Sequence, residues 1–172
     1  GGAGFPTGRK WRTVADMHSS TLPTSVVVNA AEGEPGTFKD RHLLRIDPYQ
    51  VIEGALIAAH AVSATEVIIA LKRINGDLQE IRTRAIDEIV AAGWADGIIV
   101  HLTLGPDEYL CGEESALLEV VDGRNPFPRI APPYRRGVVE LVDTNADIGT
   151  RSGLSAHVHM AGEGGAPPAL IN

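Results

Sequence analysis

Carboxylates and an amide lie directly after an apolar run in residues 26–41, VVVNAAEGEPGTFKDR. Asn29 closes the run of valines, and Glu32 and Glu34 follow in a glycine-containing loop. An apolar run that stops at such a loop indicates the carboxyl end of a buried strand, which is where open α/β sheets bind their ligands. This loop is therefore the first candidate for a binding site.

A second acidic group lies in residues 105–123, GPDEYLCGEESALLEVVDG. Glu113 and Glu114 stand at the predicted start of a helix, where carboxylates interact favourably with the helix dipole, so helix-end chemistry alone explains them. The functional alternative is that Tyr109 and the two glutamates form one wall of a pocket, with Glu32, Glu34 and the glycine-rich start of the chain as its other parts. An acidic pocket repels a bare phosphate but can accept hydrogen bonds from ribose hydroxyls.

The elements that must position these residues alternate between strand and helix. Strands are predicted at residues 26–29, 67–71 and 98–104, and helices at 38–47, 48–62, 78–93 and 114–121. Asp47 followed by Pro48 is a favoured helix start, Asp77 is a candidate cap for the next helix, and Gly93 suits its end. This order predicts an α/β fold, a Rossmann-like and mainly parallel sheet flanked by helices, with right-handed crossovers.

The first eleven residues, GGAGFPTGRKW, are a further candidate for ligand contact. Their glycines suit backbone that approaches a ligand closely, and Lys10 adds a cation. A frayed terminus is the alternative, but Phe5 and Trp11 argue against it, because a solvated linker rarely carries aromatic side chains. Residues 16–24 are polar and are expected to form a loop.

Composition excludes several classes of function. The 22 acidic against 15 basic side chains give a net charge of -7, which argues against a nucleic-acid partner. A single cysteine forms no internal disulfide, no four-thiolate zinc site and no iron–sulfur cluster. No apolar run is long enough to span a bilayer and no signal peptide is seen, so we expect a cytoplasmic chain without membrane insertion. The chain opens on Gly1 without an initiator methionine, and we expect it to be one domain of a longer protein.

Three motifs in order, GGAGFPTGRKW, VVVNAAEGEPGTFKDR and YLCGEESALLE followed by PFPRIAPPY, closely resemble the FMN-binding domain of the NADH-oxidising 51 kDa or F subunit of respiratory complex I. NAD-linked hydrogenases and formate dehydrogenases carry similar subunits. The resemblance covers residues 1–136. It implies that FMN accepts a hydride from NADH and passes electrons singly to an iron–sulfur cluster further along the same polypeptide. The chain is therefore expected to be an oxidoreductase that works with other redox subunits, peripheral on the cytoplasmic face of a membrane complex.

The same resemblance implies the domain organisation. Residues 1–172 form one FMN- and NADH-binding domain, expected to be incomplete at both ends, with residues 137–165 as an insertion. Residues 168–172 (PALIN) resume the family's pattern. The ubiquitin-like domain and the helical domain that binds the iron–sulfur cluster would follow beyond this chain.

The resemblance also implies roles for single residues. The residues expected to bind FMN are Gly1, Gly2, Lys10, Asn29, Tyr109, Gly112, Glu113, Glu114 and Asn172. Those expected to bind NADH are Phe5, Lys10, Glu32, Glu114 and Tyr134, with Phe5 stacking on the nucleotide and Glu32 holding a ribose. No residue is expected to be catalytic itself and no metal is expected. Glu32 and Glu113 would position the hydride transfer, which needs close approach of the reacting atoms rather than a proton donor.

Departures from the family's pattern motivate a rival hypothesis from another class. Ala31 stands where a carboxylate is expected to bind the ribityl chain, Thr13 replaces an aromatic residue and Ala131 replaces a lysine. The rival is a structural module that binds flavin or nucleotide without turnover. The diaphorase part of a hydrogenase or formate dehydrogenase is a further alternative. The sequence leaves open whether the nucleotide is NAD or NADP. A carboxylate at Glu32 near a ribose would disfavour the 2′-phosphate of NADP.

Other reactive side chains are explained without a site. His157 and His159 would share one face of a strand, but two ligands do not complete a metal site. Cys111 is expected to be a small packed residue. Arg135 and Arg136 could contact a phosphate, and a solvated loop pair is the simpler explanation.

Overall fold

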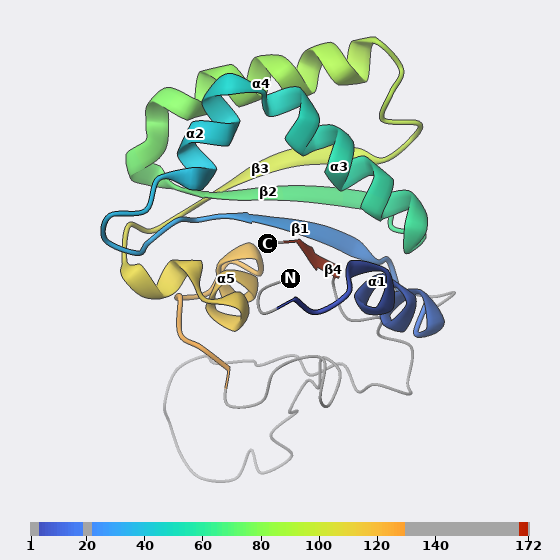
Figure 1. Ribbon diagram of the computed structural model, residues 1–172, viewed down its shortest axis with the longest axis horizontal. Helices are drawn as coiled ribbons and strands as arrows, with labels where there is room; N and C mark the ends of the chain where they lie inside the picture. Colours follow the sequence, from blue (N-terminus) through green and yellow to red (C-terminus); the bar gives the residue numbers. More distant parts are fainter. Residues whose placement is uncertain (1–3, 19–21, 130–168, 172) are drawn as a thin grey trace, which may run out of the picture.

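The computed structural model describes residues 4–18, 22–129 and 169–171 and contains a parallel β-sheet between layers of helices (Figure 1). The strands are β1 (Ser25–Ala30), β2 (Glu66–Lys72), β3 (Ile99–Gly105) and β4 (Ala169–Ile171), in the spatial order β3-β2-β1-β4. The helices are α1 (Thr7–Asp16), α2 (Lys39–Ile46), α3 (Pro48–Ala61), α4 (Gly76–Ala91) and α5 (Glu114–Val121), with the short 3-10 helices η1 (Arg73–Asn75) and η2 (Tyr109–Gly112). The predicted α/β class is confirmed, since every strand pairing within the described residues is parallel.

Helices cover both faces of the central strands β1 and β2. Helices α2, α3 and α4 pack on the face that carries Val26 and Val28, and α5 packs on the face that carries Val27 (Figure 1). Because successive side chains of a strand point to opposite faces, a continuous run of valines supplies both layers of the core. The prediction that this apolar run forms a buried strand is therefore confirmed.

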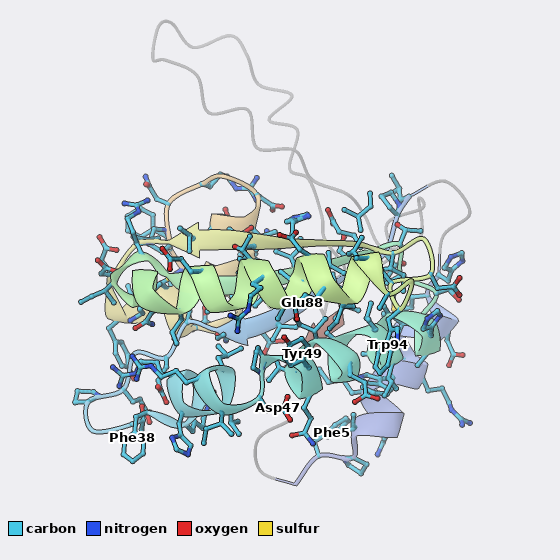
Figure 2. The ribbon with its side chains drawn as sticks, turned by 90° about the horizontal axis from the view of Figure 1, so that it is seen from above. Phe5, Phe38, Asp47, Tyr49, Glu88 and Trp94 are labelled. Carbon is cyan, nitrogen blue, oxygen red and sulfur yellow. The ribbon has the colours of Figure 1, made fainter. Side chains whose placement is uncertain are left out.

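The predicted start of α3 is confirmed. The Asp47 carboxylate accepts a hydrogen bond of 3.0 Å from the N–H of Gln50, and Pro48 occupies the first turn. Figure 2 shows Tyr49, one residue further on, directed toward Glu88 of α4, and the Tyr49 hydroxyl donates to that carboxylate. This hydrogen bond with Glu88 is the main cause of a raised pKa for Tyr49.

The start of α4 was predicted too late along the chain, whereas its end was predicted correctly. The helix begins at Gly76 after Asn75, so the proposed cap Asp77 lies within the first turn instead. At the other end Gly93 has φ +79° and its N–H bonds to the carbonyl of Val90 at 3.0 Å. The N–H of Trp94 reaches the carbonyl of Ile89 at 3.1 Å, which completes a Schellman motif.

Helix α1 and strand β4 were not predicted, nor were the short helices η1 and η2. Helix α1 begins after Pro6 and contains Gly8 and Thr13, which are poor helix formers, so its sequence gives little helical signal. Val14 of α1 is buried, with Trp11 packed against the same core cluster, and this tertiary contact stabilises the helix. Strand β4 pairs with β1 through residues more than a hundred positions away in the sequence. No helix in the described residues has the length and apolarity needed to cross a bilayer.

Replacing Asp47 by alanine is expected to lower the free energy of unfolding by about 1 kcal/mol, because the N–H of Gln50 loses its acceptor. Urea unfolding followed by circular dichroism measures this change. Asp47→Ser keeps a side-chain oxygen at the cap and should retain most of the stability. An equal loss in both variants would show that the cap hydrogen bond is not the cause.

Candidate functional site

A cavity of about 390 Å³ lies where β1 ends, between the loop that follows this strand and η2. Figure 1 shows this loop leading from β1 to α2, with the chain between β3 and α5 on the same side of the molecule. The carboxyl ends of parallel strands meet at one edge of a sheet, so the two loops come together although about 80 residues separate them. The lining residues are Asn29, Ala31, Glu32, Gly33, Glu34, Thr37, Lys39, Asp40, Tyr109, Leu110, Gly112 and Glu113.

Glu32 is a deeply buried carboxylate of this lining. Its side chain is 4% exposed, and its Oε2 pairs with Nε of Arg41 at 3.2 Å. Arg41 also donates from Nη2 to the carbonyl of Thr37 at 2.6 Å, which fixes the loop. The other carboxylate oxygen, Oε1, is buried and has no hydrogen-bond partner within the part of the chain that the structure describes. A buried acceptor without a donor is costly, so a ligand hydroxyl or N–H at this position would be stabilising.

Asn29 joins the two walls of the cavity. Its Nδ2 donates to the carbonyl of Gly112 at 3.0 Å, and its Oδ1 accepts from the N–H of Ala31 at 3.2 Å. The side-chain amide therefore holds the end of β1 against η2. A contact between Asn29 and a flavin stays a prediction, since part of its bonding capacity is used within the protein.

The two walls approach each other at a residue without a side chain. A Cβ on Gly112 would lie 2.6 Å from the carbonyl oxygen of Ala31 and 3.9 Å from the nitrogen of Gly33. The first distance is shorter than any normal contact, so this position requires glycine. Ala31 itself is buried beneath η2, in the core cluster that includes Cys111. Burial raises the pKa of the Cys111 thiol, and the cysteine is a packed residue, as predicted.

Glu113 caps helix α5. Its Oε2 accepts from the N–H of Ser115 at 3.0 Å, the hydroxyl of Ser115 at 2.7 Å and the N–H of Ala116 at 2.9 Å. Partial burial acts to raise the pKa of Glu113, but the hydrogen bonds from Ser115 and Ala116 outweigh it and lower the pKa on balance. The helix-end explanation therefore accounts for Glu113, which also lines the cavity. Glu114 occupies the first turn of α5 and is not among the lining residues.

Replacing Glu113 by alanine is expected to lower the free energy of unfolding by about 1 kcal/mol at neutral pH, because two N–H groups lose their acceptor. The carboxyl has a lower pKa in the folded state than its ordinary value of 4.5, so its stabilisation is present above that value and is lost as the pH falls through the folded pKa. The difference between wild type and variant should therefore shrink in acid, as measured by urea unfolding across pH. Glu113→Gln keeps an acceptor but removes the charge. If the stability of this variant depends on pH as that of wild type does, the pH dependence does not come from the Glu113 carboxylate.

Other residues predicted from the sequence lie away from this cavity. Phe5 and Lys10 are not among its lining residues, and helix α1 lies on the side where β1 begins, opposite the loop that lines the cavity (Figure 1). Phe5 is half exposed at the edge of the molecule, with the guanidinium of Arg9 5.8 Å from its ring centre (Figure 2). Their roles in ligand binding stay predictions. The predictions that lie outside the described residues concern Gly1, Gly2, Ala131, Tyr134, Arg135, Arg136, His157, His159, Asn172 and the insertion at 137–165.

Sequence reasoning did not single out Arg41 and Lys72. Arg41 pairs with Glu32 nine residues earlier, and the spacing alone does not predict this contact because the chain between them is a loop. Lys72 ends a strand whose other residues are mostly apolar, and it is buried. The sequence signal that could have indicated a buried charge is the lysine at the end of an otherwise apolar strand.

Comparison with known proteins identifies the family. The family model described as the Nuo51 FMN-binding domain matches residues 1–150 of the chain. The chain belongs to this family. The resemblance seen in the sequence motifs is thereby confirmed.

Relatives of this FMN-binding domain are components of NADH oxidoreductases. The chain is 42% identical over 145 residues to the F subunit of the NADH-quinone oxidoreductase of Rhodobacter capsulatus, covering 80% of this chain and 33% of that protein. It is 39% identical over 152 residues to the mitochondrial 51 kDa subunit of the NADH-ubiquinone oxidoreductase of Neurospora crassa, covering 80% of this chain and 30% of that protein. The chain thus spans about a third of the length of these relatives.

Among solved structures, an NAD⁺-reducing [NiFe]-hydrogenase in its H₂-reduced state is similar to this domain. The TM-score is 0.70 at 39% sequence identity, over 77% of this chain and 23% of that chain. The air-oxidised state of an NAD⁺-reducing [NiFe]-hydrogenase gives a TM-score of 0.69. The fold is therefore shared with part of an enzyme that reduces NAD⁺.

The residues of the cavity fit the cofactor in the family's description. The unpaired Oε1 of Glu32 offers an acceptor to a hydroxyl, and Gly33 and Gly112 keep side chains out of the space between the walls. Ala31 offers no acceptor from its side chain, so hydrogen bonds to a ribityl chain must come from other groups. The fit to the flavin therefore rests on the glycine-containing walls, and Glu32 offers its acceptor to the ribose of a second nucleotide.

Proposed function

We propose that this domain binds FMN at the carboxyl ends of β1 and β3 and oxidises NADH by hydride transfer to the flavin. The observation that carries the proposal is the buried Oε1 of Glu32, which has no hydrogen-bond partner among the described residues and lies in the lining of the cavity, in a chain of the FMN-binding domain family. A carboxylate acceptor suits a ribose hydroxyl better than a phosphate, since like charges repel. The same proposal covers the reverse reaction.

In this proposal the protein binds and orients rather than reacts. FMN, when bound, supplies the hydride acceptor. Glu32 accepts a hydrogen bond from a ribose hydroxyl of NADH, and Arg41 holds the Glu32 carboxylate in place. Asn29 and Gly112 keep the two walls at a fixed separation, and Tyr109, which is 59% exposed, lines the cavity. No side chain has to donate a proton for this step, because a hydride brings its proton together with its two electrons.

The electrons must leave through another redox centre. The chain has one cysteine, so we place the acceptor cluster on another part of the protein or on another subunit, as the names of the relatives suggest for a multi-subunit enzyme. In this proposal the domain is the electron-entry module of a complex I-like or hydrogenase-like assembly, on the cytoplasmic side and peripheral to any membrane.

A binding module without turnover is the second candidate function. Ala31 is buried and lacks the carboxylate of the family pattern, and Thr13 lies on α1, where its hydroxyl donates to the carbonyl of Arg9 at 3.0 Å. Neither residue supplies a group for a nucleotide in the cavity. These observations favour a domain that retains the fold and part of the site.

Visible spectroscopy separates the two candidates. The purified chain is mixed with FMN, desalted and scanned, and bound flavin should show the absorption of an oxidised flavin. Anaerobic addition of NADH should then bleach this absorption. Failure to take up FMN would overturn the proposal, and bound FMN that NADH never bleaches would favour the module without turnover.

A further inference from the structure

A buried ammonium group lies behind the cavity. Lys72 is the last residue of β2, which lies between β1 and β3, and it is 5% exposed. Its Nζ donates a hydrogen bond of 3.4 Å to the carbonyl oxygen of Asp107. Within the described ranges no carboxylate forms an ion pair with it. The Asp107 carboxylate is directed elsewhere, since its Oδ1 accepts from the N–H of Ile74 at 2.8 Å.

The ammonium lies close to Gly33, which lines the cavity. A Cβ on Gly33 would lie 2.8 Å from Nζ of Lys72 and 3.1 Å from the carbonyl oxygen of Tyr109. Gly33 and Tyr109 both line the cavity. A ligand that rests on Gly33 is therefore separated from the ammonium by about one residue. Glycine at position 33 is what allows this close approach.

The need for a folded core does not explain this charge. An ammonium has three N–H donors, and among the described residues a single long hydrogen bond to a carbonyl replaces its hydration. Burying a charge without a carboxylate partner is unfavourable, and an apolar side chain of similar size is often better for stability. The positive charge also acts on its surroundings, because it opposes the effect of burial on the pKa of Cys111.

We infer that Lys72 is a positioning residue that raises the reduction potential of FMN bound in the cavity. The inference rests on the proposed function. A hydride brings two electrons and one proton from NADH to the flavin, so the products are NAD⁺ and a reduced flavin that carries one more negative charge than the oxidised form. A positive charge shielded from water stabilises that reduced form relative to the oxidised one.

The test compares the reduction potential of FMN bound to wild type, Lys72→Met and Lys72→Arg. Each protein is titrated anaerobically in the presence of a reference dye, and the visible spectrum gives the ratio of reduced to oxidised flavin. Lys72→Met is expected to lower this ratio at least tenfold at a fixed potential, which corresponds to about 30 mV for a two-electron couple. Lys72→Arg keeps the charge and should restore most of the potential.

A matched control removes a positive charge from the protein surface. Arg84 on α4 has a side chain 69% exposed, so Arg84→Met makes the same change in net charge, but solvent and salt screen it. Its bound flavin should have the wild-type potential. A second measurement, the thermal unfolding of the proteins without FMN, should show Lys72→Met at least as stable as wild type.

Several outcomes would overturn the inference. Equal potentials in wild type and Lys72→Met, or an equal shift in Arg84→Met, would remove the specific role of Lys72. A loss of stability in Lys72→Met without FMN would make the residue structural. If Lys72→Met binds oxidised FMN more weakly but leaves its reduction potential unchanged, the ammonium interacts with the phosphate of FMN instead. Failure of wild type to take up FMN would overturn the proposed function and this inference with it, whereas normal uptake with unchanged potential overturns the inference alone.

Discussion

Replacing Gly112 by alanine is expected to weaken FMN binding by about a hundredfold and to lower the free energy of unfolding by about 1–3 kcal/mol. The added Cβ would lie 2.6 Å from the carbonyl oxygen of Ala31. The position of a Cβ is fixed by its own backbone and the carbonyl belongs to the backbone of Ala31, so no side-chain rotation relieves the clash. The only relief is to move η2 away from the end of β1, which also breaks the hydrogen bond from Asn29 to the carbonyl of Gly112. The two walls of the cavity would then separate.

The measurements are FMN binding by fluorescence quenching and unfolding by urea. Gly54→Ala is a matched control, because this glycine lies within α3 and a Cβ there meets nothing within 4 Å. Alanine in a helix interior is about 0.5–1 kcal/mol more favourable than glycine, so this control should be slightly more stable and bind FMN normally. Wild-type FMN affinity in Gly112→Ala would show that the close approach of η2 and β1 is not needed for the site.

Much of the fold follows from local sequence signals. Val26 to Val28 form a run that both faces of a sheet can bury, and Asp47 with Pro48 satisfies the start of α3 through groups only three residues apart. Such signals act over a few residues, so they are readable in a sequence. The start of α4 shows the limit, since Asn75 and Asp77 are both acceptable near a helix start and only the folded chain selects between them.

The position of the site was predictable, but its hydrogen bonds were not. Parallel strands bring their carboxyl ends to one edge, so the loop with Glu32 and the segment with Gly112 were expected to meet. The structure adds that Asn29 bonds to the backbone of Gly112 and that Lys72 is buried behind Gly33. These contacts depend on the separation of whole elements, and no local spacing in the sequence encodes it. Phe5 lies outside the lining residues, and its stacking on NADH, which the family resemblance implies, stays a prediction.

Replacing Glu32 by glutamine is expected to raise KM for NADH by about ten- to a hundredfold while FMN retention changes less than about threefold. The carboxylate has one oxygen engaged by Arg41 and one buried oxygen free for a ligand hydroxyl. A hydrogen bond to a charged acceptor contributes about 1.5–3 kcal/mol, and the neutral amide loses most of the charge-assisted part. If Glu32 holds the ribose of NADH, the loss falls on the nucleotide rather than on the flavin.

The matched control for this substitution is Glu34→Gln, in the same loop and the same cavity lining. Glu34 is exposed, so water already solvates its carboxylate and the change in KM should be several-fold smaller than for Glu32→Gln. Steady-state NADH oxidation with an artificial electron acceptor gives KM, and the flavin absorption after desalting gives FMN retention. An equal loss of NADH use and FMN retention in Glu32→Gln would assign the carboxylate to the flavin. Equal changes in KM for Glu32→Gln and Glu34→Gln would mean that the burial of Glu32 gives it no special role in NADH binding.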